Sequence, residues 1–526
     1  MVRTTIAAAL LLGTGFTLAQ PQGRIIWSFE GNDGIYDAIA IPDVDGDSLP
    51  DVAAAIYYSA TPSDPRKLYC CSGATGDTIW VNRTAYGTWG NKGLDVAPDL
   101  NHDGRADVLL GTAGGYTTAG RSVVAVNGLT GDTLWRYTRY QYWGWVYSVR
   151  SFADIDGDSV MDVLGGSGNA TDSAGAAVLV SGRTGQAIWL RRMYDDGVGS
   201  VAPFADVNGD SLPDVLVGVG GNSNSDSVLC LSGATGAAIW RYPAAASVSD
   251  VERIRDVNNS GTDDCIGGGW DYNVYCLEGS NGDLIWQTSM GSPRIIMELV
   301  PIRDVNADGR DDVIVGLWDS QVHVLSGLDG TTIWSGPVGA DVWSVDTLAD
   351  VTGDNVPEVV AGCLGDGTGT VKVFNGVTGV PLWYHTFSER VYDVTGAPDL
   401  TGDGHPKVLV GLQDHELEPD HLFCFDGSPP SGTAEPSIAG SEPSPTVGMV
   451  YLPRHREIAF AAPADVRYQV GLYDASGRAA GPEVSGTTAG PETRIGLAGL
   501  NLTSGPYFVR LTLDRVLVQT AKIIIP

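Results

Sequence analysis

The sequence predicts an all-β protein: an eight-bladed β-propeller closed by an N-terminal strand, followed by a small Ig/fibronectin-like β-sandwich. Three observations carry this prediction. One pattern recurs eight times at intervals of about 50 residues, which leaves room for four short strands in each copy. The eighth copy lacks its last strand, and the start of the chain supplies a matching one. The 70 glycines and the 18% share of charged residues are typical of a turn-rich β protein.

Each copy of the repeat begins with an acidic loop, which is followed by a β-branched run such as Val313-Ile314-Val315. A Thr-Gly or Asn-Gly pair then predicts a hairpin turn before a last strand that carries a tryptophan. The acidic loops begin at Asp43, Asp99, Asp154, Asp206, Asp256, Asp304, Asp350 and Asp399.

The tryptophans of the last strands indicate how the ring closes. Seven repeats carry one, at Trp80, Trp135, Trp189, Trp240, Trp286, Trp334 and Trp383. The eighth repeat ends near Phe425 without one, and the missing strand stands at the other end of the chain as Arg24-Ile25-Ile26-Trp27. An N-terminal strand that completes the last blade leaves no exposed sheet edge, which favours a closed propeller over an open solenoid.

The chain ends and the charge indicate where the protein acts. A basic Arg3, an apolar stretch over 6–19 and small residues before Gln20 are typical of a secretory signal peptide. Other apolar runs fall short of the ~20 residues of a membrane span, so we expect a secreted monomer, extracellular or on the outer cell surface. The net charge of −32 excludes nucleic acid as a partner. The expected divisions are signal peptide 1–19, propeller 20–428, Pro/Ser/Gly linker 429–448 and C-terminal β-sandwich 449–526.

The acidic loops have the composition of calcium sites. Each places oxygen ligands at positions 1, 3, 5 and 9, where a hard cation relieves the mutual repulsion of the carboxylates. Five loops keep this pattern: Asp43, Asp45, Asp47 and Asp51; Asp99, Asn101, Asp103 and Asp107; Asp154, Asp156, Asp158 and Asp162; Asp206, Asn208, Asp210 and Asp214; and Asp304, Asn306, Asp308 and Asp312. The loop fills every ligand position, so we expect the calcium ions to be structural.

The other three loops depart from the pattern. The seventh, with Asp350, Asp354 and Glu358, should bind calcium less well, and the fifth, which begins at Asp256, more weakly still. In the eighth loop Lys407 stands where the last carboxylate belongs, and its ammonium group can replace the ion. The alternative for all the loops is a set of Asp-capped turns that hold no metal.

Two resemblances to known families follow from these motifs. The spacing of the acidic loops resembles the calcium loops of integrin-like FG-GAP propellers, which lie between the first and second strands of a blade. The run Gly73-Ala74-Thr75-Gly76-Asp77-Thr78-Ile79-Trp80 resembles the docking motif of pyrroloquinoline-quinone propellers and their non-catalytic relatives. This second resemblance spans 24–427 and implies eight blades, with each tryptophan packed between neighbours.

The same resemblance raises the question of a cofactor, because quinone-dependent alcohol dehydrogenases use a disulfide between adjacent cysteines. Cys70 and Cys71 are such a pair. Across the repeats, however, Cys70 shares its place with other cysteines and with small apolar residues, which is typical of a buried core thiol. We therefore expect no pyrroloquinoline quinone and identify no catalytic residues.

A ligand is expected at the channel mouth opposite the acidic loops, where the innermost strands begin. Counting back seven residues from each loop gives one candidate ring and counting back six gives another. Aromatic groups beside carboxylates suit carbohydrate or a cationic group. The candidate residues are Tyr36, Asp37, Tyr147, Trp343, Tyr392 and Asp393, and Tyr140, Tyr142, Trp143 and Trp145 add aromatic groups near blade three. The alternative is that these residues only fill the channel.

The C-terminal region predicts how the protein is exported. Its strands around Leu502-Thr503-Ser504-Gly505-Pro506-Tyr507-Phe508 resemble the sorting domains of type IX secretion cargo, which implies the secretion machinery as a partner. The chain departs from that pattern by ending in Pro526 without a basic cluster. The alternative is a generic fibronectin-like module.

Taken together, these features predict a secreted calcium-binding propeller that acts as an extracellular or cell-surface binding or scaffold protein for a glycan or protein ligand. The alternatives are enzymes on the same fold: a polysaccharide lyase-like propeller or a quinone-dependent dehydrogenase. The seven histidines are scattered along the chain, which gives no sign of a catalytic cluster.

Calcium that binds only the folded protein must stabilise it. Chelation with EDTA should therefore lower the melting temperature of the mature protein, and added calcium should restore it. A melting temperature that does not respond to EDTA would contradict the calcium assignment.

Overall fold

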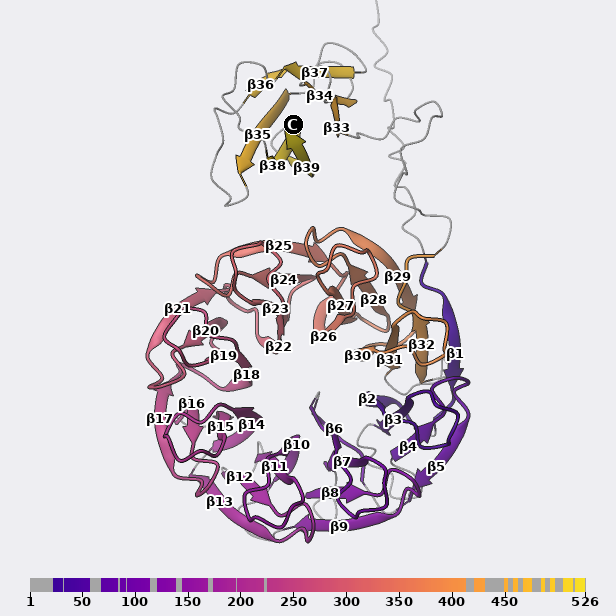
Figure 1. Cartoon of the computed structure of the whole chain (residues 1–526), viewed down its shortest axis with the longest axis vertical. Coiled ribbons are helices and arrows are strands. Elements are labelled where there is room, and N and C mark those ends of the chain that lie inside the picture. The colour runs from indigo at the N-terminus through magenta and orange to yellow at the C-terminus, as the bar shows by residue number, and fades with distance from the viewer. Residues whose placement is uncertain are drawn as a thin grey trace, which may run out of the picture.

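The computed structural model contains a ring of eight blades, which confirms the predicted eight-bladed propeller (Figure 1). It describes residues 22–31, 33–56, 68–83, 86–90, 92–113, 121–138, 144–168, 174–194, 196–221, 225–412 and 421–430, and the C-terminal segments 449–452, 457–461, 467–474, 484–487, 492–496, 505–513 and 516–525. The predicted signal peptide and most of the predicted linker lie outside these ranges. Across these ranges, no helix has the length and apolar character needed to cross a membrane.

Each blade is a four-stranded antiparallel sheet whose first strand is the innermost. Blades one to four are β2 (Ile35–Ile41), β3 (Asp51–Ile56), β4 (Leu68–Cys71) and β5 (Thr78–Asn82); β6 (Leu94–Ala97), β7 (Asp107–Gly111), β8 (Ser122–Val126) and β9 (Thr133–Thr138); β10 (Trp145–Phe152), β11 (Asp162–Gly168), β12 (Ala174–Val180) and β13 (Ala187–Tyr194); and β14 (Asp196–Phe204), β15 (Asp214–Gly221), β16 (Ser227–Leu231) and β17 (Ala238–Pro243).

Blades five to seven repeat this order, and blade eight differs only in the origin of its outer strand. They are β18 (Val248–Ile254), β19 (Asp264–Gly269), β20 (Asn273–Leu277) and β21 (Leu284–Ser289); β22 (Ile296–Ile302), β23 (Asp312–Leu317), β24 (Gln321–Leu325) and β25 (Thr332–Pro337); β26 (Asp341–Leu348), β27 (Glu358–Leu364), β28 (Gly369–Phe374) and β29 (Pro381–Phe387); and β30 (Val391–Ala397), β31 (Lys407–Leu412), β32 (Leu422–Asp426) and β1 (Ile25–Phe29).

The ring is closed by its N-terminal strand, as the sequence predicts. Strand β1 pairs antiparallel with β32, with Trp27 opposite Cys424, and Figure 1 shows indigo β1 beside orange β32. The last blade thus combines the two ends of the propeller. Because a complete fourth strand covers β32, the last blade has the same four-stranded form as the others.

Neighbouring blades are joined by one hydrogen bond that recurs around the ring. The indole Nε1 of each outer-strand tryptophan donates to the carbonyl of a glycine that follows the third strand of the next blade, at 2.5–2.9 Å. The first such pair is Trp27 with Gly73, and the last is Trp383 with Gly427. All eight contacts have the same geometry, so the predicted packing of tryptophan between blades is confirmed.

The hairpin that receives the indole needs glycine at a second position. Gly76 has φ +78°, and a Cβ there would lie 2.8 Å from the Trp27 ring. Gly131 has φ +74° and stands in the same relation to Trp80. Only glycine adopts this left-handed backbone readily and also has no side chain that would contact the ring. The glycine of the Thr-Gly pair therefore allows both the turn and the close packing of the tryptophan ring against it.

The acidic loops lie between the first and second strands of each blade. Their last carboxylate contributes to the joint between blades, by which we mean the contact of the outer-strand tryptophan with the glycine of the next blade. Asp51 is fully buried and accepts hydrogen bonds from the amide of Val44, at 2.8 Å, and from that of Gly73, at 3.1 Å. Gly73 is also the residue whose carbonyl receives Trp27. The acid at position 9 of the first seven loops makes this pair of contacts.

The hydrophobic core is divided among the interfaces between blades. Each cluster combines side chains of the middle and outer strands of one blade with side chains of the inner and middle strands of the next. All seven cysteines are buried and unbonded, including Cys70 and Cys71. This agrees with the expectation that they are core thiols, and burial raises the pKa of Cys71 to about 12.

The C-terminal region forms two antiparallel sheets. One has three strands in the order β33 (Met449–Leu452), β34 (Glu457–Ala461) and β37 (Glu492–Gly496). The other has four strands in the order β36 (Val484–Thr487), β35 (Arg467–Asp474), β38 (Gly505–Leu513) and β39 (Val516–Ile525).

The closing strand should account for a measurable part of the stability. Trp27→Phe removes the indole N–H and should cost about 1–3 kcal/mol, because the buried Gly73 carbonyl loses its donor. Trp27→Ala also removes the ring and should cost about 3–5 kcal/mol. Trp270→Ala is the control, since that side chain is 50% exposed and its loss should cost within ~0.5 kcal/mol. Guanidinium chloride unfolding measures all three, and a Trp27→Ala variant as stable as the control would contradict the closure.

Candidate binding site at the channel mouth

A repeated β-bulge orients side chains at the start of the innermost strands. In blade one the pairing of β2 with β3 shifts between Ile35 and Asp37, so Tyr36 is the extra residue. The same shift makes Tyr147 and Trp343 the extra residues of blades three and seven. A bulge redirects the side chain that it contains. The bulge residues are the ring found by counting seven residues back from the acidic loops.

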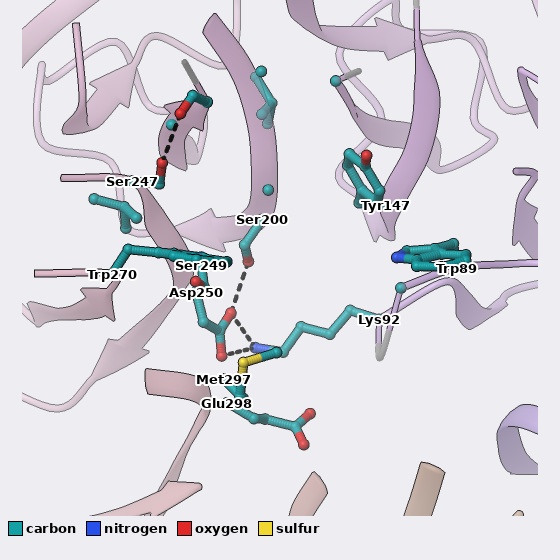
Figure 2. Close-up of a pocket in the computed structure, with 18 of the residues that line it drawn as sticks. Trp89, Lys92, Tyr147, Ser200, Ser247, Ser249, Asp250, Trp270, Met297 and Glu298 are labelled. Carbon is teal, nitrogen blue, oxygen red and sulfur yellow. Dashed lines mark hydrogen bonds and ion pairs between the residues drawn. The ribbon is translucent and has the colours of Figure 1, made fainter. Parts of the chain in front are cut away.

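A cavity of about 560 Å³ opens at this mouth of the channel (Figure 2). The bulge residues of blades one, three, four, five, six and seven line it: Tyr36, Tyr147, Gly199, Ser249, Met297 and Trp343. Blade two contributes Lys92, which lies two residues before β6. The backbone of Lys92 forms an isolated parallel β-bridge with Ser148. The glycine and serine of blades four and five leave that side of the rim less filled than the aromatic side.

Aromatic rings form a continuous arc along one side of the mouth. From blade seven to blade three the order is Trp343, Tyr392, Tyr36, Trp89, Trp145 and Tyr147, with neighbouring ring centroids 4.7–6.4 Å apart. On the far side, Trp270 and Trp318 follow the second strands of blades five and six, with centroids 6.0 Å apart. Both line the cavity and are exposed, Trp270 by 50% and Trp318 by 37%.

The floor of the cavity is an ion pair that crosses the channel. Lys92 extends from blade two to blade five, where its ammonium lies 2.6 and 2.7 Å from the two carboxylate oxygens of Asp250 (Figure 2). It also contacts Glu252, which Arg150 approaches at 3.6 Å. Asp250 and Glu252 hold the Lys92 ammonium in its charged form and raise its pKa, against the effect of burial.

The carboxylates six residues before the loops brace one blade against the next. Asp37 accepts a hydrogen bond from the Leu94 amide at 2.8 Å, and Asp393 accepts one from the Ala38 amide at 2.9 Å. Both are 3% exposed. They are not among the residues that line the cavity, and neither is Tyr392, which packs between Tyr36 and Trp343. Of the predicted ligand residues, the structure thus brings Tyr36, Tyr147 and Trp343 to the cavity.

Burial and mutual repulsion shift the titration of these inner carboxyl groups. Burial raises the pKa of Glu298 to about 8 and that of Asp346 to about 6. The pKa of Asp393 is raised to about 7, by burial and then by the charge of Asp346. Near neutral pH the channel therefore holds carboxyl groups that are partly protonated.

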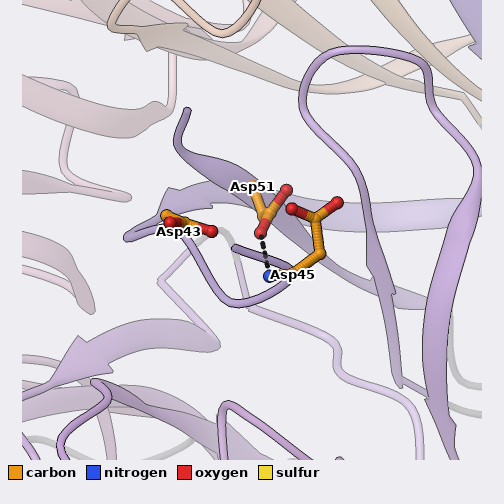
Figure 3. Close-up of side chains that lie close together, drawn as sticks. All are labelled: Asp43, Asp45 and Asp51. Atoms are coloured by element: carbon orange, nitrogen blue, oxygen red, sulfur yellow. Dashed lines mark hydrogen bonds between the residues drawn. The ribbon is translucent and has the colours of Figure 1, made fainter. Parts of the chain in front are cut away.

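On the opposite face, two acidic loops bring three carboxylates close together. In Asp43, Asp45 and Asp51, and again in Asp154, Asp156 and Asp162, one oxygen from each residue lies within 4.8 Å of the others (Figure 3). These are the two such groups in the part of the chain that the structure describes. Oxygen ligands of this kind suit a hard cation such as calcium.

The acidic side chains also accept hydrogen bonds from the protein, in the loops at Asp43 and Asp154 as in the others. Asp99, Asp304 and Asp350 cap backbone amides four or five residues ahead, in the manner of Asx turns. Side-chain amides or hydroxyls of the next hairpin reach Asp103, Asp308 and Asp354. In the fourth loop Asn208 donates its own amide to Asp214. The calcium assignment and the metal-free alternative therefore both remain predictions for all the acidic loops.

The eighth loop carries its own cation. The Lys407 side chain is fully buried, and its ammonium lies 2.7 Å from Asp403 and 3.6 Å from Asp399. It also donates to the carbonyl of His405 at 2.6 Å. The lysine thus occupies the position between the carboxylates that the sequence assigned to it in place of an ion.

Sequence reasoning missed the cross-channel pair and the outer tryptophans. Lys92 stands in the ring of bulge positions, but its partner Asp250 is 158 residues away. Trp270 and Trp318 each follow a Gly-rich or β-branched second strand directly, and this shared position was the signal that could have identified them. The predicted Tyr140, Tyr142 and Trp143 lie outside the described residues, whereas Trp145 belongs to the aromatic arc.

The eight blades, the Gly-x-Thr-Gly hairpins and the docked tryptophans define the chain as a β-propeller built from PQQ-like repeats. The chain belongs to the family described as outer membrane protein assembly factor BamB, whose model matches residues 17–214 and 214–404. No curated protein matches the chain.

Solved structures share the propeller fold at low sequence identity. The computationally designed Ika8 protein is 14% identical with a TM-score of 0.52, and the match covers 77% of this chain and all of that one. Sqt1 of Saccharomyces cerevisiae is 10% identical with a TM-score of 0.53 and the same coverage of both chains. At these identities the likeness concerns the fold alone.

Proposed function

We propose that this protein is a non-enzymatic binding or scaffold protein that acts outside the cell or on the outer cell surface. In this proposal it holds a glycan or protein ligand in the cavity at the channel mouth. The observation that carries the proposal is the 560 Å³ cavity with aromatic groups on two sides and charged groups on its floor.

The composition of the cavity supports binding. Ligand sites are concave, rich in aromatic surface and equipped with a few polar groups that fix orientation. Here Trp270 and Trp318 present exposed rings side by side, and contiguous exposed apolar surface marks interaction sites. Ser200, Ser249 and Asp250 supply polar groups at the same mouth.

Membership of the family supports a role in binding proteins. The name of the family refers to the assembly of outer membrane proteins. A closed ring offers a rigid frame on which loops and channel mouth face a partner. For this chain we propose a role in binding proteins, without assigning it the partners that the family name implies.

We also propose structural calcium in the five acidic loops that keep the full ligand pattern. The loops lie on the face opposite the cavity, between the first and second strands of each blade. An ion there would hold the loop whose last carboxylate bonds to the docking glycine. Calcium would then stabilise the joints between blades and take no direct part in ligand binding.

For localisation, we propose export directed by the N-terminal signal peptide, with the C-terminal region acting as a type IX sorting domain. The support is the sequence pattern of both ends and the strand β38, which contains the Gly-Pro-Tyr-Phe segment of the motif. The mature protein is proposed to act as a monomer. The quinone-dehydrogenase alternative gains no support from Cys70 and Cys71, which are buried and unbonded.

Binding at the channel mouth can be tested on glycan and protein arrays with the mature protein. Trp343→Ala and Tyr147→Ala each remove an aromatic face from the cavity and should weaken binding about tenfold, the effect of ~1.4 kcal/mol. Leu328→Ala is the control, because Leu328 is 46% exposed and lies in a hairpin on the opposite face. Unchanged binding in both cavity variants would contradict the site.

A further inference from the structure

The cavity contains one carboxyl group that lacks a cationic partner. Lys92, Asp250 and Glu298 are the charged residues among those that line it. Asp250 is engaged by the Lys92 ammonium through both oxygens. Glu298 forms no ion pair with any described residue, so the cavity holds one negative charge more than positive ones when Glu298 is ionised.

Glu298 is held with one oxygen directed away from its structural contact. Its Oε2 accepts a hydrogen bond from the amide of Val345 at 2.9 Å, which braces blade six against blade seven. The structure gives Oε1 no hydrogen-bond partner among the described residues. The side chain is 7% exposed, and that exposure faces the cavity. In Figure 2 the carboxyl group lies beside the Lys92–Asp250 pair, with no dashed line to it.

Aromatic side chains line the same cavity as this carboxyl group. Trp343 lies two residues before the amide that anchors Glu298, and both side chains line the cavity. Tyr36 and Trp89 continue the aromatic lining toward blade two. A cavity that holds both a carboxylate and aromatic faces suits an ammonium or guanidinium group, because both attract a cation and the aromatic faces also accept its apolar stem.

We propose that the cavity receives a cationic side chain, an arginine or lysine, from a protein partner, and that Glu298 is its anchor. This inference rests on the proposed function and specifies the ligand at that site. A cationic group bound beside Glu298 would stabilise the ionised carboxylate, whereas a neutral glycan would leave the carboxyl group protonated near neutral pH. The high negative charge of the whole chain favours the approach of a basic partner.

The titration of Glu298 gives the interaction a pH dependence. Its pKa is raised to about 8. Burial raises the pKa most, the Lys92 ammonium lowers it, Asp250 on β18 raises it, the Val345 amide lowers it and Asp393 on β30 raises it. Asp37 on β2 also faces it. Binding of a cation requires the ionised carboxylate, so below pH 8 the carboxyl must first release a proton. Affinity for a cationic group should therefore rise from pH 6 to pH 8.5.

The test uses the mature full-length protein and two capped peptides that differ in one charge: acetyl-Gly-Arg-Gly-amide and its neutral isostere with citrulline in place of arginine. Isothermal titration should show at least tenfold tighter binding of the arginine peptide, and tighter binding at pH 8.5 than at pH 6. Glu298→Gln keeps the shape and an oxygen for the Val345 amide, and should lose at least tenfold in affinity.

The matched control is Glu278→Gln, which removes the same charge from a hairpin on the opposite face, where Glu278 bonds to Asn258 and Ser280. It should leave the affinity unchanged. Equal binding of the two peptides to the unaltered protein would overturn the inference without need of a variant. Equal losses in both variants would also overturn it, because they would indicate an effect of net charge.

The outcome also separates this inference from the proposed function. If the arginine peptide does not bind but a neutral oligosaccharide binds and depends on Trp343, the cationic ligand is wrong and the binding site stands. If no ligand from the arrays or the peptide pair depends on the cavity residues, both proposals fail.

Discussion

The hydrogen bond from each tryptophan indole to a glycine carbonyl of the next blade is the interaction on which the propeller depends. It recurs eight times, and the glycine that accepts it in seven blades also donates its amide to the last carboxylate of an acidic loop. Outer strand, hairpin and acidic loop are thus fixed together at every joint. In the eighth blade Lys407 replaces the acid, and the Gly427 amide bonds to the carbonyl of Pro406 instead.

The two faces of the ring differ in their chemistry, and the joints between blades lie on one of them. On one face lie the hairpins and acidic loops, where carboxylates serve the contacts between blades. On the other face the bulged starts of the inner strands direct side chains to the channel mouth. Because the joints and the inner braces such as Asp37 to Leu94 fix the frame, the residues at bulge positions are free to vary between aromatic, small and charged types. The cavity is lined by these differing residues.

The repeat pattern was sufficient to predict the blades, and the unmatched Trp27 was sufficient to predict how they close. Both depend on local spacing, which the sequence displays directly. The residues at the channel mouth are harder to predict from sequence, because two neighbouring residues of each inner strand are equal candidates for facing the cavity. The bulge decided between them: it placed Tyr36 at the cavity and turned Asp37 to the next blade. The Lys92–Asp250 pair could not be predicted, since it joins blades two and five across the channel and no local pattern marks it.

The central claim is that the two faces have separate tasks, with ions stabilising one and ligand bound at the other. A crystal structure of the mature protein grown with calcium and acetyl-Gly-Arg-Gly-amide, with anomalous differences recorded, tests it most directly. The account predicts a guanidinium group within hydrogen-bond distance of Glu298. It also predicts anomalous peaks in the five acidic loops that begin at Asp43, Asp99, Asp154, Asp206 and Asp304. Loops without peaks, or a peptide bound among the acidic loops with the cavity left to solvent, would contradict it.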